Sequence, residues 1–400
     1  MFAANSVAHE FAGGPAAALV RGVASADPTR RSAAALGSLA AAVTASGEWT
    51  RVLDLLLAHR LTPLAAIRLA AADHIPGDLR DNLERERRDA AFHALAAAAE
   101  LTAALRALAA AGIPALPFKG PALALVAYGD VGARRMVDVD IVVEPANRRR
   151  ALRALGDGGW TWNTGGAHTR DVLHRWLGHV PIERAGAAYG VELHWRFAPL
   201  ALPWTLPVTD VLRRAQPVSS APDASWLVPH PVDHLLLLAW HGTRHGWETL
   251  EWIASFAQVL ALCSQDGAVE ATETAWRVGG TRALGIAVSV ARDALGVDVP
   301  EPFVSLVEHP AVRAESLRIV ASLWLDTSAR TADREARGRH AYWMNALDSA
   351  TAKARFVTLT ALQPTERELE MVRLPDALAA LYDPLRLARV AARAILRRTA

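Results

Sequence analysis

Two aspartates, Asp138 and Asp140, interrupt an apolar run that extends from Val137 to Val143. The β-branched residues of this run predict a strand. Because side chains two residues apart on a strand point to the same face, both carboxylates should leave the strand together. Two carboxylates so close repel each other in a partly buried place unless a cation compensates them. The pair suits Mg²⁺, which binds one or two protein carboxylates together with phosphates and water; the alternative is a strand end with solvated or capped aspartates.

Residues upstream of the pair favour a phosphate ligand. Lys119 and Gly120 lie between a predicted strand and a predicted helix. A glycine there lets a ligand approach the backbone, the first amides of the helix point at that ligand, and the lysine supplies positive charge. Arg134 and Arg135 lie just before the aspartates. They would add positive charge, unless they are simply solvated in a loop.

A third carboxylate, Glu192, lies in another predicted strand, where it alternates with Val191 and Leu193. Alternation places the glutamate on one face of the strand and its apolar neighbours on the other. A sheet could therefore bring Glu192 beside Asp138 and Asp140, so that three carboxylates share one face.

The elements that must position these residues divide the 400-residue chain into three regions. Residues 1–110 have helical spacing, and the stretch from Asp78 to Ala111 contains no Gly or Pro. Residues 111–200 alternate short apolar runs with helical segments, and residues 201–400 return to helical spacing with proline-rich joints. The predicted strands are Ile113–Phe118, Val137–Val143, His179–Glu183 and Ala188–Arg196, and the predicted helices between the first three are Pro121–Tyr128 and Ala146–Leu155.

Composition indicates a globular protein without a disulfide framework. Hydrophobic residues make up 52% of the chain and charged residues 21%, and Cys263 is its single cysteine. The formal net charge of +2 gives no global field that would require a nucleic-acid partner. No continuous apolar run reaches the roughly 18 to 20 residues of a membrane span, and the N-terminus lacks a basic leader with an apolar segment. We therefore expect a cytoplasmic protein without a transmembrane segment.

The ordered motifs resemble those of the uncharacterised nucleotidyltransferase family, a branch of the polymerase-β-like nucleotidyltransferase superfamily. That family typically has an L-K-G turn, a D-h-D-h-h-V strand and an acidic-x-H-W strand. This chain has Phe118-Lys119-Gly120, then Tyr128, Arg134 and Arg135, then Asp138-x-Asp140, then Val191-Glu192-Leu193-His194-Trp195. The similarity extends outward to Trp49–Pro63, to His234-Leu235-Leu236, His241, His245 and Trp252, and to Leu374-Pro375 and Leu381-Tyr382, so it covers about residues 45–390.

Two positions depart from the pattern. The superfamily's Gly-Ser turn is Lys119-Gly120 here, followed by Pro121, so no serine is available to hold a phosphate. This departure is usual for the branch. Ser255 stands where the family typically has an aspartate, so the helix after Trp252 lacks that carboxylate.

The resemblance implies an α+β fold. A small mixed β-sheet at residues 111–200 would form the nucleotidyltransferase core, between an N-terminal helical region at residues 1–110 and a C-terminal helical region at residues 201–400. The reaction would move a nucleoside monophosphate from a nucleoside triphosphate, with AMP from ATP as the first choice. The acceptor would be a hydroxyl or similar group of a small molecule, peptide or protein that the sequence does not name.

The resemblance also implies roles for the residues singled out above. The implied site consists of Asp138, Asp140 and Glu192 for Mg²⁺ or Mn²⁺, and of Lys119, Gly120, Arg134 and Arg135 for the triphosphate. Glu192 would complete a second metal site or take the proton from the acceptor. The positive side chains would neutralise charge on the phosphates.

His241 and His245 are four residues apart, which places them on one face of a predicted helix. This spacing can bind zinc, but residue 242 is Gly rather than the Glu of a metalloprotease helix, and no third ligand is evident. Two alternatives remain. The helix face lines a cleft opposite the sheet, where these histidines or Arg244 contact nucleotide or acceptor, or it is ordinary packing.

Four arginines near the C-terminus, Arg386, Arg389, Arg393 and Arg397, recur at spacings of three and four. They predict one arginine stripe on an amphipathic helix, which could contact an anionic membrane surface or a nucleic acid. The alternative is a solvated helix face that packs through the apolar residues between the arginines.

Two functions remain open from the sequence. One is an active nucleotidyltransferase, and the other is a catalytically inactive nucleotide-binding or interaction module that retains the fold. The three carboxylates favour the active nucleotidyltransferase. Unpaired acidic side chains lower the stability of the fold, and an inactive module would have no need of them.

Overall fold

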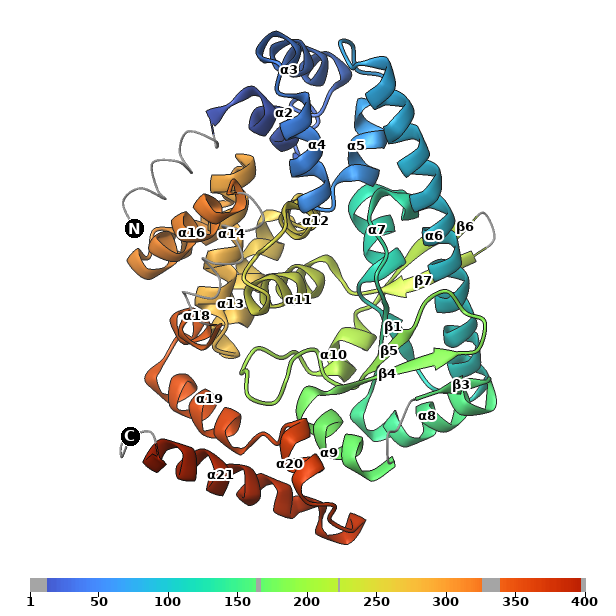
Figure 1. Ribbon diagram of the computed structural model, residues 1–400, viewed down its shortest axis with the longest axis vertical. Helices are drawn as coiled ribbons and strands as arrows, with labels where there is room; N and C mark the ends of the chain where they lie inside the picture. Colours follow the sequence, from blue (N-terminus) through green and yellow to red (C-terminus); the bar gives the residue numbers. More distant parts are fainter. Residues whose placement is uncertain (1–12, 163–166, 222–223, 326–338, 397–400) are drawn as a thin grey trace.

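A small mixed sheet surrounded by helices forms the fold (Figure 1). The computed structural model describes residues 13–162, 167–221, 224–325 and 339–396. The strands are β1 at Ala115–Pro117, β2 at Val139–Val143, β3 at Trp160–Thr161, β4 at His179–Arg184 and β5 at Val191–His194, in the order β1-β2-β5-β4-β3. β2 and β5 are parallel, and the other neighbouring strands are antiparallel. The α+β fold with flanking helices, implied by the resemblance, is confirmed.

All four predicted strands are present, with bounds that differ by a few residues. The short β3 was not predicted, and neither was a hairpin of β6 at Gln216–Ala221 and β7 at Ala224–Val228. The expectation of helices with proline-rich joints was therefore wrong for this part of the third region. Pro217 lies in β6 opposite Leu227. Proline is tolerated there because β6 is an edge strand, paired with β7 alone within the described chain.

Helices precede, interleave with and follow the sheet. The first group is α2 at Pro15–Ala24, α3 at Ala33–Ser46, α4 at Trp49–Ala58, α5 at Thr62–Leu69 and α6 at Gly77–Ala110. Around the strands lie α7 at Gly120–Tyr128, η1 at Val131–Ala133, η2 at Pro145–Asn147, α8 at Arg148–Asp157 and α9 at Ala167–Leu177. The remaining helices are α10 at Val208–Arg213, α11 at Pro231–Arg244, α12 at Leu250–Leu260, α13 at Gln265–Arg277, α14 at Thr281–Leu295, α15 at Glu301–Val307, α16 at Pro310–Leu323, α18 at Arg339–Ala346, α19 at Ala350–Leu362, α20 at Glu366–Met371, η3 at Asp376–Leu381 and α21 at Tyr382–Leu396.

The apolar face of the sheet packs against α6 and α8. Val139, Ile141 and Leu193 are fully buried in one cluster with Ala97 and Leu101 of α6. Strand alternation puts the polar residues of β2 and β5 on the opposite face. One face of the sheet therefore belongs to the core, and the other carries the charged side chains.

The helix α6 is long and apolar enough to cross a membrane by length and composition alone. No other helix in the described ranges meets both conditions. The apolar window is 33% buried in the structure, and its Ala104 and Leu108 pack in the same core as the sheet. Since core helices of globular proteins pass the same test, α6 is weak evidence for a membrane span.

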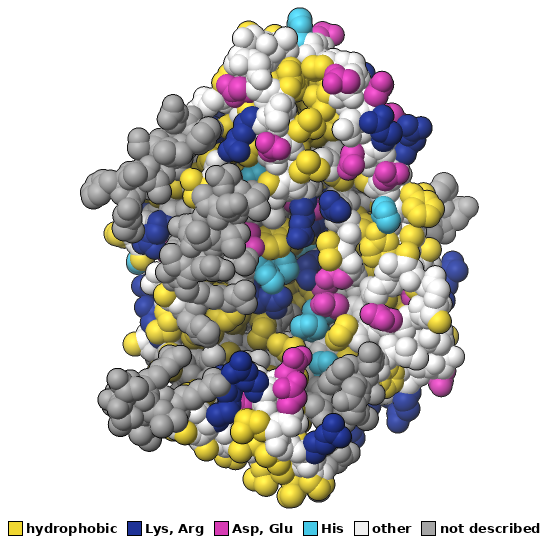
Figure 2. Space-filling model, in the orientation of Figure 1, with side chains coloured by type: hydrophobic (Ala, Val, Ile, Leu, Met, Phe, Trp, Pro, Cys, Tyr) yellow, Lys and Arg dark blue, Asp and Glu magenta, His cyan; other side chains and the backbone are white. Residues whose placement is uncertain are grey.

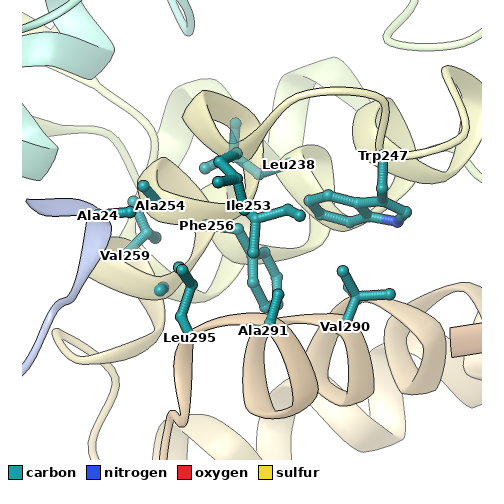
Figure 3. Packing of buried hydrophobic residues seen from close by; sticks show 14 of the residues in the cluster. Ala24, Leu238, Trp247, Ile253, Ala254, Phe256, Val259, Val290, Ala291 and Leu295 are labelled. Atoms are coloured by element: carbon teal, nitrogen blue, oxygen red, sulfur yellow. The ribbon is translucent and has the colours of Figure 1, made fainter. Parts of the chain in front are cut away.

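A larger core joins helices of the first and third regions. Buried residues of α2 and α4 share one cluster with those of α11, α12 and α14. Figure 3 shows Trp247 in this packing beside Ile253 and Val290. The rings of Trp247 and Phe256 meet edge to face with centroids 5.5 Å apart. This packing fixes α11, α12 and α14 relative to one another.

The C-terminal end of α11 depends on a contact between Gly242 and Trp247. A Cβ atom at position 242 would lie 2.5 Å from the indole ring, closer than carbon atoms approach. The chain turns back at this point, and the Trp247 amide donates to the Gly242 carbonyl at 2.9 Å. Glycine at 242 therefore lets the indole close over the helix end, which sets the positions of Arg244 and His245.

We expect Gly242→Ala to destabilise the fold by about 1–3 kcal/mol, because the added methyl overlaps the buried indole. In an open helix the same change would add roughly 1 kcal/mol of stability, so a net loss reports the overlap. Chemical unfolding measures the difference. Gly77→Ala in the first turn of α6, where nothing lies within 4 Å of an added Cβ, is the matched control and should lose no stability. Equal stability of Gly242→Ala and the parent would contradict the contact.

The C-terminal arginine stripe is partly used inside the molecule. Arg386 and Arg389 of α21 both pair with Glu368 of α20, Arg386 at 3.5 Å. Glu368 is fully buried and also accepts a hydrogen bond from the Thr365 amide at 2.8 Å. These two arginines therefore dock α21 onto α20. The side chain of Arg393 and all of Arg397 lie outside the described residues, and contact of this helix with an anionic surface stays a prediction.

Candidate active site

Strand pairing brings Asp138, Asp140 and Glu192 together on the sheet face opposite the core. In the parallel pair, Asp140 of β2 lies directly opposite Glu192 of β5. Asp138 precedes Asp140 by two residues and shares its face. One oxygen of each carboxylate lies within 4.8 Å of the other two. The three carboxylates that the sequence singled out therefore form one cluster.

The turn between β1 and α7 lies against the start of β2. Lys119 is the N-cap of α7, and Gly120 follows with a φ of 56°. A Cβ atom at Gly120 would lie 2.9 Å from the carbonyl oxygen of Asp138, so glycine permits this close approach. The Nζ atom of Lys119 forms an ion pair with Oδ1 of Asp140. The structure thus places Lys119 and Gly120 directly beside the carboxylates.

Two histidines to which the sequence analysis gave no role adjoin the carboxylates. Nε2 of His194 lies 3.1 Å from Oδ1 of Asp140 and 3.2 Å from Oε2 of Glu192. His179 stacks on His194 with ring centroids 4.7 Å apart, and its Nε2 lies 3.8 Å from Oε2 of Glu192. The spacing Glu192-x-His194 in a strand was a usable signal for one of them. His179 reaches this group because the antiparallel register of β4 and β5 places it opposite His194. No local sequence pattern indicates that register.

Burial and charge act differently on the two aspartates. Burial raises the pKa of Asp138 to about 6, and the neighbouring carboxylate of Asp140 adds to the effect. Burial also opposes ionisation of Asp140, but the Lys119 ammonium and the hydrogen bond from His194 outweigh it and hold the pKa of Asp140 well below its usual range. Asp138 is therefore the carboxylate whose negative charge the metal-free fold disfavours.

Glu192 and His194 stabilise each other's charged forms. Burial opposes the charge of Glu192, but the hydrogen bond from His194 lowers its pKa. Burial likewise opposes the charge of His194, but Asp140 and Glu192 as acceptors raise its pKa. Burial and the nearby His194 cation lower the pKa of His179 to about 4. One nitrogen of His194 thus links carboxylates on adjacent strands.

The donor set fits a hard divalent cation. Oδ2 of Asp140 is buried and has no hydrogen-bond partner among the described residues, which is costly for an acceptor. Carboxylate oxygens, three of which converge here, are preferred ligands of Mg²⁺ and Mn²⁺. His179, Glu192 and His194 form a second close group, but the two imidazole planes are only 25° apart. An ion bound by both nitrogens would have to lie in both planes, so the oxygen set is the better candidate.

The C-terminal end of α11 faces the carboxylates from the opposite wall. His241 and His245 lie 4.6 Å apart between ring centroids, and Trp252 of α12 contacts both rings, at 5.5 and 5.4 Å. Burial, and then the positive charge of Lys119, hold the pKa of His241 well below its usual value. Figure 2 shows histidine, basic and acidic side chains gathered in a hollow on this face of the molecule. Within the described ranges, neither helix histidine belongs to a group of three possible metal ligands.

The two arginines that precede the aspartates have different surroundings. Arg134 is buried, and its Nε lies 3.5 Å from Oε1 of the buried Glu251 in α12. Arg135 is exposed. Ser255, one turn after Glu251, donates to the Glu251 carbonyl at 2.8 Å and so accepts from the Tyr128 hydroxyl at 3.2 Å. The structure thus separates two arginines that the sequence left interchangeable, since Arg134 lies against a buried carboxyl group whose pKa burial raises, and Arg135 faces solvent.

A small mixed sheet that carries an aspartate pair on one strand and a third carboxylate opposite it on the next has the architecture of nucleotidyltransferases. The chain belongs to the uncharacterised nucleotidyltransferase family, whose model matches residues 45–296. The match spans every residue of the predicted site, whereas the similarity at Leu374-Pro375 and Leu381-Tyr382 lies beyond it. No curated protein matches the chain. Membership of this family supports nucleotidyl transfer as the function and a transferase as the class of enzyme.

We expect the two aspartates to have opposite effects on the free energy of unfolding in metal-free buffer at pH 7.5. Asp138→Asn should raise it by about 1 kcal/mol, because folding opposes the ionisation of this carboxylate. Asp140→Asn should lower it by about 1–3 kcal/mol, because Lys119 would stay largely buried without its anionic partner.

Urea unfolding across the pH range with a chelator present measures both effects. A raised carboxylate pKa costs stability above the folded-state pKa and nothing below the unfolded-state pKa. The advantage of Asp138→Asn should therefore disappear as the pH falls from about 6 toward 4. Equal destabilisation by both substitutions would show that Asp138 has a structural hydrogen-bonding role instead.

Proposed function

We propose that the protein is a Mg²⁺-dependent nucleotidyltransferase, with Mn²⁺ as an alternative ion. It moves a nucleoside monophosphate, AMP from ATP in the first instance, onto a hydroxyl or similar group of a small molecule, peptide or protein. The observation that carries the proposal is the pairing of Asp140 with Glu192 across parallel strands, with Asp138 on the same face. Oδ2 of Asp140 is buried and has no hydrogen-bond partner in the described ranges. Family membership supports the class of reaction.

The binding roles follow from the donor set. Asp138, Asp140 and Glu192 would hold the ion, which when bound neutralises and orients phosphate oxygens. Lys119, at the start of α7, would add positive charge beside the phosphates. Gly120 would let the phosphate chain approach the first amides of that helix.

The chemical step is a displacement at the α-phosphate. The acceptor oxygen forms a bond to the α-phosphorus, the bond from that phosphorus to the oxygen bridging to the β-phosphate breaks, and pyrophosphate leaves. Glu192 would take the proton of the acceptor hydroxyl, since its lowered pKa keeps it ionised. His194 would act as a positioning residue, because its Nε2 lies 3.2 Å from the Glu192 carboxylate.

The rings on the opposite wall would give the nucleobase a stacking surface. His241, His245 and Trp252 form a compact aromatic group there. Stacking is tolerant of base identity, because every base has a π-face. All four triphosphates therefore belong in the test.

Thermal unfolding with each nucleoside triphosphate tests the binding part of the proposal. A ligand at 100 times its Kd raises stability by about 2.7 kcal/mol. The rise should require Mg²⁺ or Mn²⁺, and it should be lost with a chelator and in Asp138→Asn. Incubation with α-labelled triphosphates and fractionated host extract then identifies base and acceptor through the labelled product. Stabilisation without label transfer would favour the inactive module, and no stabilisation by any triphosphate would contradict both.

We expect Glu192→Gln to lower the rate of label transfer by about 10²- to 10⁴-fold, the usual range for general-base help. The Kd of the metal-bound triphosphate should stay within a few-fold of the parent value, because Asp138 and Asp140 still bind the ion. The interaction that is lost stabilises the transition state rather than the bound substrate. Rate assays and calorimetric titration measure the two effects separately.

Glu183→Gln is the matched control for this variant, since Glu183 is an exposed carboxylate on the neighbouring β4. It should keep both rate and affinity. A Glu192→Gln protein that unfolds more easily, yet keeps most of its activity per folded molecule, would contradict the catalytic role. It would show that Glu192 has a structural role instead.

A further inference from the structure

Arg244, the last residue of α11, feels the charges of Glu192 and Asp140 but forms no ion pair with any of the described residues. Lys119 pairs with Asp140, and Arg134 lies against Glu251. In contrast, no carboxylate of the described residues lies within 4.0 Å of the Arg244 guanidinium. Burying a charged group costs free energy of desolvation unless an opposite charge lies beside it. Arg244 is therefore suited to an anionic ligand.

A neutral group orients the Arg244 guanidinium. Its Nε and Nη2 atoms donate to Nε2 of His245 at 3.1 and 2.9 Å. Since a guanidinium only donates, this nitrogen of His245 accepts and carries no proton. The contact fixes the plane of the group without neutralising its charge. Nη1 has no hydrogen-bond partner in the described part of the chain.

Arg244 acts on the carboxylate cluster through its charge. Burial lowers its pKa, and the negative charges of Glu192 and Asp140 act in the opposite direction. Its positive charge in turn contributes to the lowered pKa of His179, after burial and the charge of His194. The backbone is held independently of the side chain, since Nε1 of Trp343 donates to the Arg244 carbonyl at 2.9 Å. The guanidinium thus reaches the site from a fixed helix end.

We propose that Arg244 binds the phosphate chain of the donor nucleotide from the wall opposite the carboxylates. This inference rests on the proposed function, and it assigns phosphate recognition to the third region of the chain. The open edge of a planar guanidinium can bind phosphate oxygens in a fork. A triphosphate with one Mg²⁺ keeps excess negative charge, which a desolvated cation compensates. Arg134, a candidate for this role from the sequence, has Glu251 instead.

A structural role for Arg244 has a different signature. If the residue only offsets the charges of Asp140 and Glu192, its loss should destabilise the ligand-free protein and leave phosphate affinity unchanged per folded molecule. If it binds phosphate, its loss should weaken affinity, and the metal-free, ligand-free fold should retain its stability.

Calorimetric titrations with ATP and with inorganic tripolyphosphate, each with Mg²⁺, test the proposal. Arg244→Gln should raise both Kd values about 10- to 100-fold, the range for charge-assisted hydrogen bonds. Arg244→Lys, which keeps the charge and loses the fork, should give intermediate values. Arg277→Gln is the matched control, because it also removes the last arginine of a helix, at an exposed position of α13. It should leave both Kd values unchanged.

The outcomes separate this inference from the proposed function. Unchanged Kd values in a folded Arg244→Gln protein would overturn the inference and leave the transferase standing. Tripolyphosphate binding that depends on Arg244, in a parent protein that transfers no label, would support the inference and remove the transferase. A parent that binds neither probe would overturn both. If Arg244→Gln does not fold, Arg244→Lys decides the question, and a parent-like Kd for tripolyphosphate would overturn the inference.

Discussion

The parallel pairing of β2 with β5 is the constraint on which the candidate site depends. Asp140 and Glu192 are distant in sequence, and only this register places them opposite each other. A slip of one residue would turn Glu192 into the core and an apolar neighbour toward the site. The register is held by the other face, where Val139, Ile141 and Leu193 are completely buried against α6 and α8. Hydrophobic packing on one side of the sheet therefore sets the carboxylate geometry on the other.

The opposite wall is tied to the sheet by buried polar contacts. His234 of α11 donates from Nε2 to the Phe118 carbonyl at 2.8 Å, directly before Lys119. Burial lowers the pKa of His234 to about 4, so this contact is made by a neutral ring. A looser buried contact, between Nε of Arg134 and Oε1 of Glu251 at 3.5 Å, connects the segment before β2 to α12. Buried polar partners tolerate little displacement. The third region is thus positioned against the site rather than merely attached to it.

Local patterns predicted the parts of the site that local geometry determines. Asp138-x-Asp140 could be placed on one strand face, and Lys119-Gly120 at a helix start, because alternation and turn chemistry act over a few residues. His179 could not be found, since its place depends on which strand lies beside β5. The different surroundings of Arg134 and Arg135 depend on α12, which lies far along the chain. The hairpin at β6 and β7 was missed because proline was taken as a break, although an edge strand tolerates it.

The site holds buried charges of both signs, which the protein offsets only in part. Asp138 has a raised pKa, and within the described chain Oδ2 of Asp140 has no hydrogen-bond partner and Arg244 has no ion-pair partner. The carboxylates belong to the sheet and the guanidinium to α11, and no ion pair within 4.0 Å forms between them among the described residues. A bound cation alone would offset only the negative charge of the carboxylates on the sheet. A bound anion alone would offset only the positive charge of the guanidinium on α11. A metal ion bound to a polyphosphate offsets both charges at once. The metal ion and the polyphosphate should therefore each bind more tightly when the other is present.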